Sequence, residues 1–130
     1  MARVRVKDVM NQEKGVATPE TTVSEAVEIM LKSRYHDILV EKDGLFEGIV
    51  TWNELIKINP EQRANFHVRN FPVKKIWILA DESVLEAYKI MTKERIDLLP
   101  VMEREKPDTV IGVITNESIT STIEKAKTLR

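Results

Sequence analysis

The sequence predicts an α/β (α+β) fold made of two β-α-β-β-α repeats that pack as a pseudo-two-fold pair. The segment GIVTWNEL at residues 48–55 returns as GVITNESI at residues 112–119. Shifted by 61 positions, residues 22–40 match residues 83–101 at eight of nineteen places. Both halves contain the same features in the same order, as in an internal repeat. These features are a helix with capping residues and a periodic apolar face, a hairpin and a strand-to-helix junction. Neither half could bury its sheet face alone at this size, so the halves must pack together.

The first half begins with a lead-in arm at residues 1–10, which ends in the helical turn VKDVM. A short strand is predicted at residues 15–18, where Pro19 closes it. Thr22 then opens a helix that runs to about Ser33, because Thr22 and Glu25 have the spacing of a capping box. The helix should bury a stripe with i, i+3, i+4, i+7 spacing: Val23, Ala26, Val27 and Met30.

A hairpin and a second helix complete this half. Strands are predicted at residues 37–40 and 45–50, since Asp43 and Gly44 between them suit a tight β-turn. A helix should follow from Thr51 to Ile58, and Pro60 limits it.

The second half repeats this plan with two changes. Its capping box maps onto Ser83 and Glu86, and its hairpin is three residues longer. A C-terminal helix should begin at about Asn116. The predicted stripe is Val84, Ala87, Tyr88 and Met91. The predicted organisation is a first repeat with its lead-in at residues 1–58, a connector at 59–67 and a second repeat at 68–130.

Composition narrows the class of protein. The 130 residues include 32% charged side chains at a formal net charge of -1, so the balance does not recruit a polyanion. Cysteine is absent, which excludes disulfides and thiolate chemistry and agrees with a reducing compartment. The apolar runs are too short to cross a bilayer. We therefore expect a soluble, cytoplasmic protein without a membrane segment.

The two Gly-x-x-Thr junctions are the predicted functional positions. A strand that ends at a threonine helix cap presents a hydroxyl, free backbone N–H groups and the positive end of a helix dipole. These features suit a phosphate. Thr51 and Glu54 also have capping-box spacing, whereas Thr115 lacks the glutamate and should be a simple cap.

This tandem resembles the CBS domain pair, or Bateman module, from VKDVM through GIVTWNEL and from Val68 through GVITNESI, with LLPV at residues 98–101. The resemblance implies a stand-alone regulatory module without catalytic activity. Such pairs usually form disc-shaped dimers, bind adenosine-type ligands in the clefts between repeats and signal to a partner protein. It implies no required cofactor, with AMP, ADP, ATP or S-adenosylmethionine as the regulatory ligand.

The family pattern assigns ligand roles by position. A first-strand pair holds the base through backbone groups, the start of the second strand forms its wall, the junction threonine takes phosphate, and a residue three further on holds the ribose. Leu39 replaces the family's common proline, and Glu54 and Ser118 replace its ribose-binding aspartate. The implied first-half residues are Val16, Ala17, Asp37, Ile38, Leu39, Thr51 and Glu54. The implied second-half residues are Trp77, Ile78, Leu98, Leu99, Pro100, Thr115 and Ser118.

Several candidates have a simpler explanation. Lys14 and Lys75 precede the first strands and are candidate phosphate partners, although exposed lysines more often only solubilise. His36 beside Asp37 lacks the further ligands of a metal or acid–base site. Trp52 and Trp77 could stack a base, although a large aromatic in a small core is more often packing.

Three hypotheses follow. The chain is a nucleotide-sensing module, or a ligand-free dimerisation scaffold of the same fold, or, as the least favoured reading, a nucleic-acid-binding protein or enzyme. The basic termini are the only feature that points to nucleic acid, and no aromatic-studded basic face accompanies them. A homodimer is expected because the remaining helices present apolar faces in a chain too small to bury them.

Overall fold

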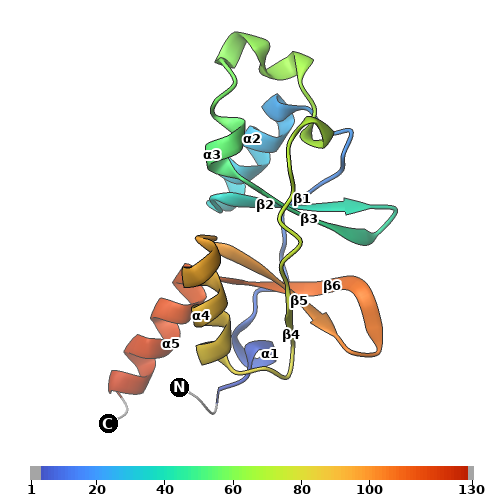
Figure 1. The fold of residues 1–130 in the computed structure, drawn as a ribbon. Helices are drawn as coiled ribbons and strands as arrows, with labels where there is room; N and C mark the ends of the chain where they lie inside the picture. Colours follow the sequence, from blue (N-terminus) through green and yellow to red (C-terminus); the bar gives the residue numbers. More distant parts are fainter. Residues whose placement is uncertain (1–3, 129–130) are drawn as a thin grey trace. The chain divides into compact units, whose positions relative to one another are not determined.

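The computed structural model describes residues 4–128, and the side chains of residues 4–125. It contains two three-stranded sheets, ordered β1-β2-β3 and β4-β5-β6 (Figure 1). The described chain divides into two compact units. We call residues 14–76 the first unit, and residues 77–128 together with residues 4–13 the second unit. The mixed α+β architecture agrees with the predicted fold class.

The first unit follows the order β-α-β-β-α. Strand β1 pairs in parallel with β2, and β2 pairs antiparallel with β3. The register of β2 and β3 shifts between Val40 and Glu41. The elements are β1 (Val16–Ala17), α2 (Val23–Ser33), β2 (Asp37–Lys42), β3 (Leu45–Thr51), α3 (Trp52–Leu55) and the 3₁₀ turns η1 (Pro60–Asn65) and η2 (Val68–Asn70).

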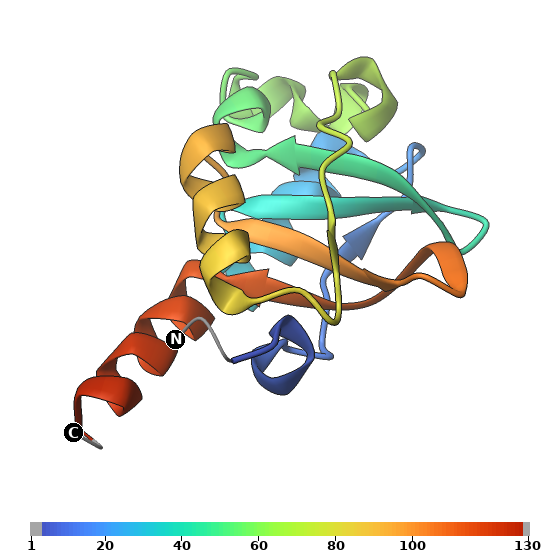
Figure 2. The same ribbon diagram turned by 60° about the horizontal axis from the view of Figure 1, so that its bottom comes forward.

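The second unit repeats this pattern. Strand β4 is parallel to β5, which is antiparallel to β6. The lead-in helix α1 lies against the C-terminal helix α5 (Figures 1 and 2). The elements are α1 (Val6–Val9), β4 (Ile78–Leu79), α4 (Val84–Glu94), β5 (Leu98–Glu103), β6 (Lys106–Thr115) and α5 (Asn116–Thr128).

Local capping and turn chemistry explain the helix starts and the first hairpin. The hydroxyl of Thr22 accepts the N–H of Glu25 at 3.1 Å, and the Glu25 carboxylate accepts the N–H of Thr22 at 3.0 Å. This confirms the predicted capping box. Ser83 accepts the N–H of Glu86 at 3.1 Å, which caps α4. Asp43 and Gly44 both have positive φ, as a two-residue hairpin turn of type I′ requires.

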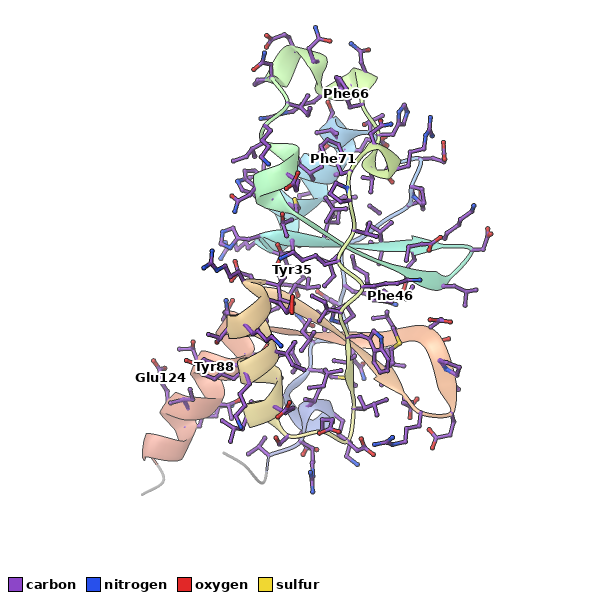
Figure 3. All side chains as sticks on the ribbon, in the orientation of Figure 1. Tyr35, Phe46, Phe66, Phe71, Tyr88 and Glu124 are labelled. Atoms are coloured by element: carbon purple, nitrogen blue, oxygen red, sulfur yellow. The ribbon has the colours of Figure 1, made fainter. Side chains whose placement is uncertain are left out.

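The buried helix stripes were predicted correctly with one exception. Tyr88 is 45% exposed, whereas Val27 at the matching place in α2 is 8% exposed. The phenol ring is larger than the valine side chain and carries a hydroxyl that favours water, so it projects from α4 at the surface (Figure 3). The remaining stripe residues are buried: Val23, Ala26, Met30, Val84, Ala87 and Met91.

The helix after Thr51 is shorter than predicted. It ends at Leu55 instead of Ile58. The N–H of Ile58 bonds the carbonyl of Leu55 at 3.2 Å, which is the tighter spacing of a 3₁₀ turn. The Arg63 Nε atom donates to the Ile58 carbonyl at 2.9 Å, so a side chain takes the place of the next helical turn.

The segment before each first strand docks by matching backbone hydrogen bonds. In the second unit, the N–H of Val6 donates to Glu82 at 2.8 Å, and Asn11 pairs with Val113. In the first unit, the N–H of Val68 donates to Thr21 at 2.9 Å, and Ile49 pairs with Lys74. The lead-in of the first sequence repeat therefore packs in the second unit. The predicted repeat bounds describe the order of motifs, and they stay a prediction.

The glycines of the two Gly-x-x-Thr junctions make room for the segments that form these β-bridges. A Cβ on Gly112 would lie 2.9 Å from the Met10 sulfur and 3.0 Å from the Asn11 carbonyl oxygen. A Cβ on Gly48 would lie 2.7 Å from the Cβ of Val73. At all three distances a Cβ would force its neighbour to move, so packing explains why glycine occurs at both positions.

Candidate functional site

Each unit contains one strand-to-helix junction beside the start of its central strand. Thr51 at the end of β3 pairs with Asp37 at the start of β2. Thr115 at the end of β6 pairs with Leu98 at the start of β5. The hairpin register therefore brings each predicted phosphate residue next to the predicted wall residues of the same unit.

The first junction does not contain the predicted capping box. Thr51 occupies the N-cap position of α3, but its side chain makes no cap hydrogen bond. The Glu54 carboxylate instead accepts a hydrogen bond from Lys57 at 3.3 Å. The N–H of Trp52 donates to the carbonyl of His36 at 2.8 Å. Because α3 is only one turn long and Glu54 has a nearby lysine, the reciprocal cap does not form.

The second junction has the predicted threonine cap. The Thr115 hydroxyl accepts the N–H of Ser118 at 3.2 Å, and the two hydroxyl groups are hydrogen-bonded at 3.0 Å. Thr115 is only 8% exposed. Thr115 and Ser118, predicted to hold phosphate and ribose, therefore lie side by side at the N-terminus of a 13-residue helix.

The first-strand residues fall at slightly different places in the two units. Val16 and Ala17 form β1 opposite Leu39 and Val40. In the second unit β4 begins at Ile78, so Trp77 precedes the strand and is 45% exposed.

The predicted wall residues are part of the core. All lie in the central strands and are buried, so they offer main-chain groups more readily than side chains. Asp37 is the charged member of this set, and it is 4% exposed. The buried apolar members are Ile38, Leu39, Leu98, Leu99 and Pro100.

The two lysines have different surroundings. The Lys14 ammonium lies 3.2 Å from the Glu41 carboxylate, and both side chains are largely shielded. Lys75 is exposed. Lys14 is therefore already neutralised by a carboxylate in β2, and a phosphate would have to compete with Glu41.

A cavity of about 530 Å³ lies beside Ser118 in the second unit. Its apolar wall comes from the lead-in, and its polar wall follows α5 at i, i+3, i+4, i+7 spacing. The sequence reasoning did not select this polar row, although its spacing was visible. The lining residues are Val4, Asp8, Val9, Met10, Ser118, Ser121, Thr122 and Lys125.

The described part of the chain was compared with the features of a metal site and of a membrane-spanning helix. No group of three or more His, Cys, Asp or Glu side chains there could hold a metal ion. None of the helices described is long and apolar enough to span a bilayer.

The family model for the CBS domain matches twice, at residues 6–61 and 68–125. The chain belongs to the CBS domain family. A curated relative, homoserine O-acetyltransferase from Methanosarcina acetivorans, is 29% identical over 127 residues, which are 96% of this chain and 23% of that protein. The chain spans less than a third of the length of each curated relative it matches.

Solved CBS structures share the fold. One is a CBS domain pair in complex with 5′-methylthioadenosine and S-adenosyl-L-methionine (TM-score 0.79, 21% identity, 95% of this chain and 98% of that chain). A second, CBSX2 in complex with AMP, has a TM-score of 0.78 at 18% identity, covering 95% of this chain and 98% of that chain. A third is the CBS domain of a bacterial CNNM/CorC family Mg²⁺ transporter in complex with ATP (TM-score 0.78, 14% identity, 95% of this chain and 89% of that chain).

Proposed function

We propose that this CBS domain pair is a regulatory module that binds an adenosine-type ligand at its two strand-to-helix junctions. The observation that carries the proposal is the pairing of Thr115 and Ser118 at the start of α5. There, two hydroxyl groups meet the N-terminus of a long helix, where backbone N–H groups and the helix dipole favour a phosphate. The ligands named for the related structures are AMP, ATP and S-adenosylmethionine.

In this proposal each junction threonine takes the phosphate and the residue three further on takes the ribose. The base would lie against the first-strand pair of a repeat, Val16 with Ala17 or Trp77 with Ile78. The buried wall residues would meet the base through their backbone. Lys14 and Lys75 are the proposed phosphate partners outside the junctions.

The two junctions should bind unequally. At the first, the Thr51 hydroxyl is not engaged in a helix cap, but Glu54 is held by Lys57. At the second, Thr115 and Ser118 bond each other, and no carboxylate occupies the ribose position. Hydrogen bonds to a charged acceptor are worth about 1.5 to 3 kcal/mol, so the first junction should be the tighter ribose site.

We further propose that the protein acts as a homodimer, signals to a protein partner and does not itself catalyse a reaction. Exposed apolar side chains support self-association in each unit. Ile56 is 41% exposed in the first unit. Tyr88 is 45% exposed in the second.

Calorimetry and thermal melting with AMP, ADP, ATP and S-adenosylmethionine test the ligand proposal. A ligand that binds only the folded state raises stability by RT ln(1 + [L]/Kd), so binding should raise the melting temperature. Trp52 directly follows Thr51, so binding should also change tryptophan fluorescence. No heat and no thermal shift at millimolar ligand would contradict the proposal.

The competing function is a ligand-free dimerisation scaffold. Glu54 and Ser118 favour it, because neither junction carries the aspartate that the family pattern places at the ribose. A stable dimer by sedimentation without any nucleotide effect would support the scaffold.

A further inference from the structure

The first unit has a hollow of about 330 Å³ outside the residues assigned to the ligand. It lies between the C-terminal end of α2 and the start of α3. The lining combines an apolar wall, two aromatic rings, an imidazole and a guanidinium. The lining residues are Met30, Leu31, Arg34, Tyr35, His36 and Trp52.

Backbone geometry holds this lining in place. Arg34 ends α2 in the left-handed conformation, with φ 63°, and thereby turns the chain toward Tyr35 (labelled in Figure 3) and His36. The N–H of Trp52 donates to the carbonyl of His36 at 2.8 Å, which fastens the first residue of α3 beside the start of β2. The hollow is therefore built by two fixed chain reversals.

The second unit is an internal comparison, because the same turns carry different side chains there. Arg95 ends α4 in the same left-handed conformation, with φ 56°. The places of His36 and Trp52 are taken by Asp97 and Asn116, and the Asn116 amide donates a hydrogen bond to the Asp97 carboxylate. The residues that match Leu31 and Tyr35 are Thr92 and Ile96. The two aromatic rings and the exposed leucine thus belong to the first unit alone.

The charges around the hollow select for an anion. Two carboxylates close to the lining residues in sequence have lysine partners, since Glu28 pairs with Lys32 at 3.4 Å and Glu54 pairs with Lys57 at 3.3 Å. The carboxylate that follows His36 belongs to Asp37, which is buried at 4% exposure. Among the described residues, the Arg34 side chain has no carboxylate partner. A guanidinium in this state matches a carboxylate with two parallel hydrogen bonds.

The apolar part of the lining resembles the centre of a protein interface. Trp, Tyr and Arg dominate interface hot spots, and methionine adapts to varied partners. Leu31 beside them is 66% exposed, which leaves an apolar rim for a partner to cover. The hollow is also open on the protein surface, as a docking site for an extended segment would be.

We propose that this hollow docks a protein partner through a segment that carries a carboxylate beside a large apolar side chain. The carboxylate pairs with Arg34, and the apolar group rests on Trp52 and Leu31. This inference rests on the proposed signalling function and gives it a surface. Trp52 directly follows Thr51, so a ligand held at Thr51 would shift the wall of the docking site.

Peptide titration tests the proposal with Trp52 as the reporter. Replacing Trp77 by Phe leaves Trp52 as the single tryptophan of the two in the chain. The probes are acetylated Gly-Glu-Phe-Glu-Gly, with Gly-Lys-Phe-Lys-Gly and Gly-Glu-Ser-Glu-Gly as comparisons. We expect a saturable fluorescence change with the first peptide. The other two peptides should bind about tenfold more weakly than the first, or not at all. No response to the first peptide at millimolar concentration would overturn the proposal.

Matched variants separate docking from folding. Arg34→Gln should lower the affinity for the acidic peptide by about tenfold or more, because the charge-assisted hydrogen bonds to its carboxylate are lost. Arg95→Gln changes the same helix-ending position in the second unit and should leave peptide binding unchanged. Equal losses in both variants would overturn the assignment to Arg34. The double substitution His36→Asp and Trp52→Asn copies the second unit and should also abolish peptide binding. Calorimetry measures binding in this variant, because the tryptophan reporter is lost.

Other occupants are distinguishable. If 3-phenylpropanoate binds as tightly as the peptide, the hollow is a small-molecule site and the docking proposal is wrong. It is also wrong if Leu31→Ser dissociates a dimer in sedimentation while the peptide has no effect, because a second copy then fills the hollow. AMP titration of the unsubstituted protein by calorimetry reports on the proposed ligand function separately: peptide binding without AMP binding would contradict that function and leave the docking site standing.

Discussion

Asn11 and Val113 exchange both of their backbone hydrogen bonds, and each N–H donates to the other residue's carbonyl at 2.8 Å. Residues from opposite ends of the chain thereby form an isolated antiparallel β-bridge, and Gly112 lies next to it. The matching pair in the first unit, Ile49 and Lys74, lies next to Gly48. The repeated junction sequence therefore serves two purposes: its glycine admits the lead-in and its threonine starts a helix.

Gly112→Ala should destabilise the protein by about 1 to 3 kcal/mol, because the added methyl group overpacks against Met10 and Asn11. Urea unfolding measures the change. Met10→Ala combined with Gly112→Ala should recover only part of the loss, since the Asn11 carbonyl oxygen remains 3.0 Å from the new Cβ. Full recovery would show that the backbone crossing is not what requires glycine.

Val6→Ala should cost about 2 kcal/mol, because Val6 is fully buried and its truncation leaves a small cavity. Val68→Ala should cost about the same, since Val68 is 1% exposed at the matching place of the first unit. Val73→Ala is the control, because Val73 is 42% exposed and should lose much less. Equal effects at Val6 and Val73 would contradict the docking of the lead-in.

The two junction threonines should differ in their contribution to stability. Thr115→Val removes the cap of α5 and should cost about 1 kcal/mol, whereas Thr51 makes no side-chain cap bond and Thr51→Val should be nearly neutral. Thermal unfolding of both variants tests this. Under the proposed function both variants should also weaken AMP binding, so a variant that keeps AMP affinity would remove its threonine from the ligand site.

Ser118→Asp should tighten AMP at the second junction by about ten- to a hundredfold, because a carboxylate replaces a hydroxyl at the ribose position. Glu54→Asp should change the first junction less, since the charge is already present there. Calorimetry with AMP measures both. Unchanged affinity in a folded Ser118→Asp protein would mean that the ribose is not held at this position.

The capping box of α2 should make stability depend on pH. Hydrogen bonds from the Thr22 backbone N–H and hydroxyl to the carboxylate lower the pKa of Glu25. A carboxyl group with a pKa below its unfolded value stabilises the fold above the unfolded pKa, and this contribution is lost as the pH falls through the folded pKa. Glu25→Gln should therefore lose less stability on acidification than the parent protein in urea unfolding at several pH values. The substitution Glu28→Gln, on the exposed face of α2, is the control.

The sequence by itself determined the features that depend on neighbouring residues. Local spacing predicts the duplication, the Thr22 and Glu25 cap and the Asp43 and Gly44 turn. Hairpin register pairs each junction threonine with its central strand. For the same reason, Thr51 with Asp37 and Thr115 with Leu98 could be predicted as neighbours. The positions of both candidate junctions could therefore be predicted from the sequence, and their role in ligand binding stays a prediction.

Only the tertiary structure decided the features that depend on distant or competing partners. No local signal shows that Asn11 pairs with Val113. Glu54 had capping-box spacing, but Lys57 and a one-turn helix offered a competing arrangement. Tyr88 matched the buried period, yet its size and hydroxyl placed it at the surface. The hollow beside Arg34 likewise arises because two chain reversals bring residues from α2 and α3 together, since short-range spacing cannot specify contacts between separate elements.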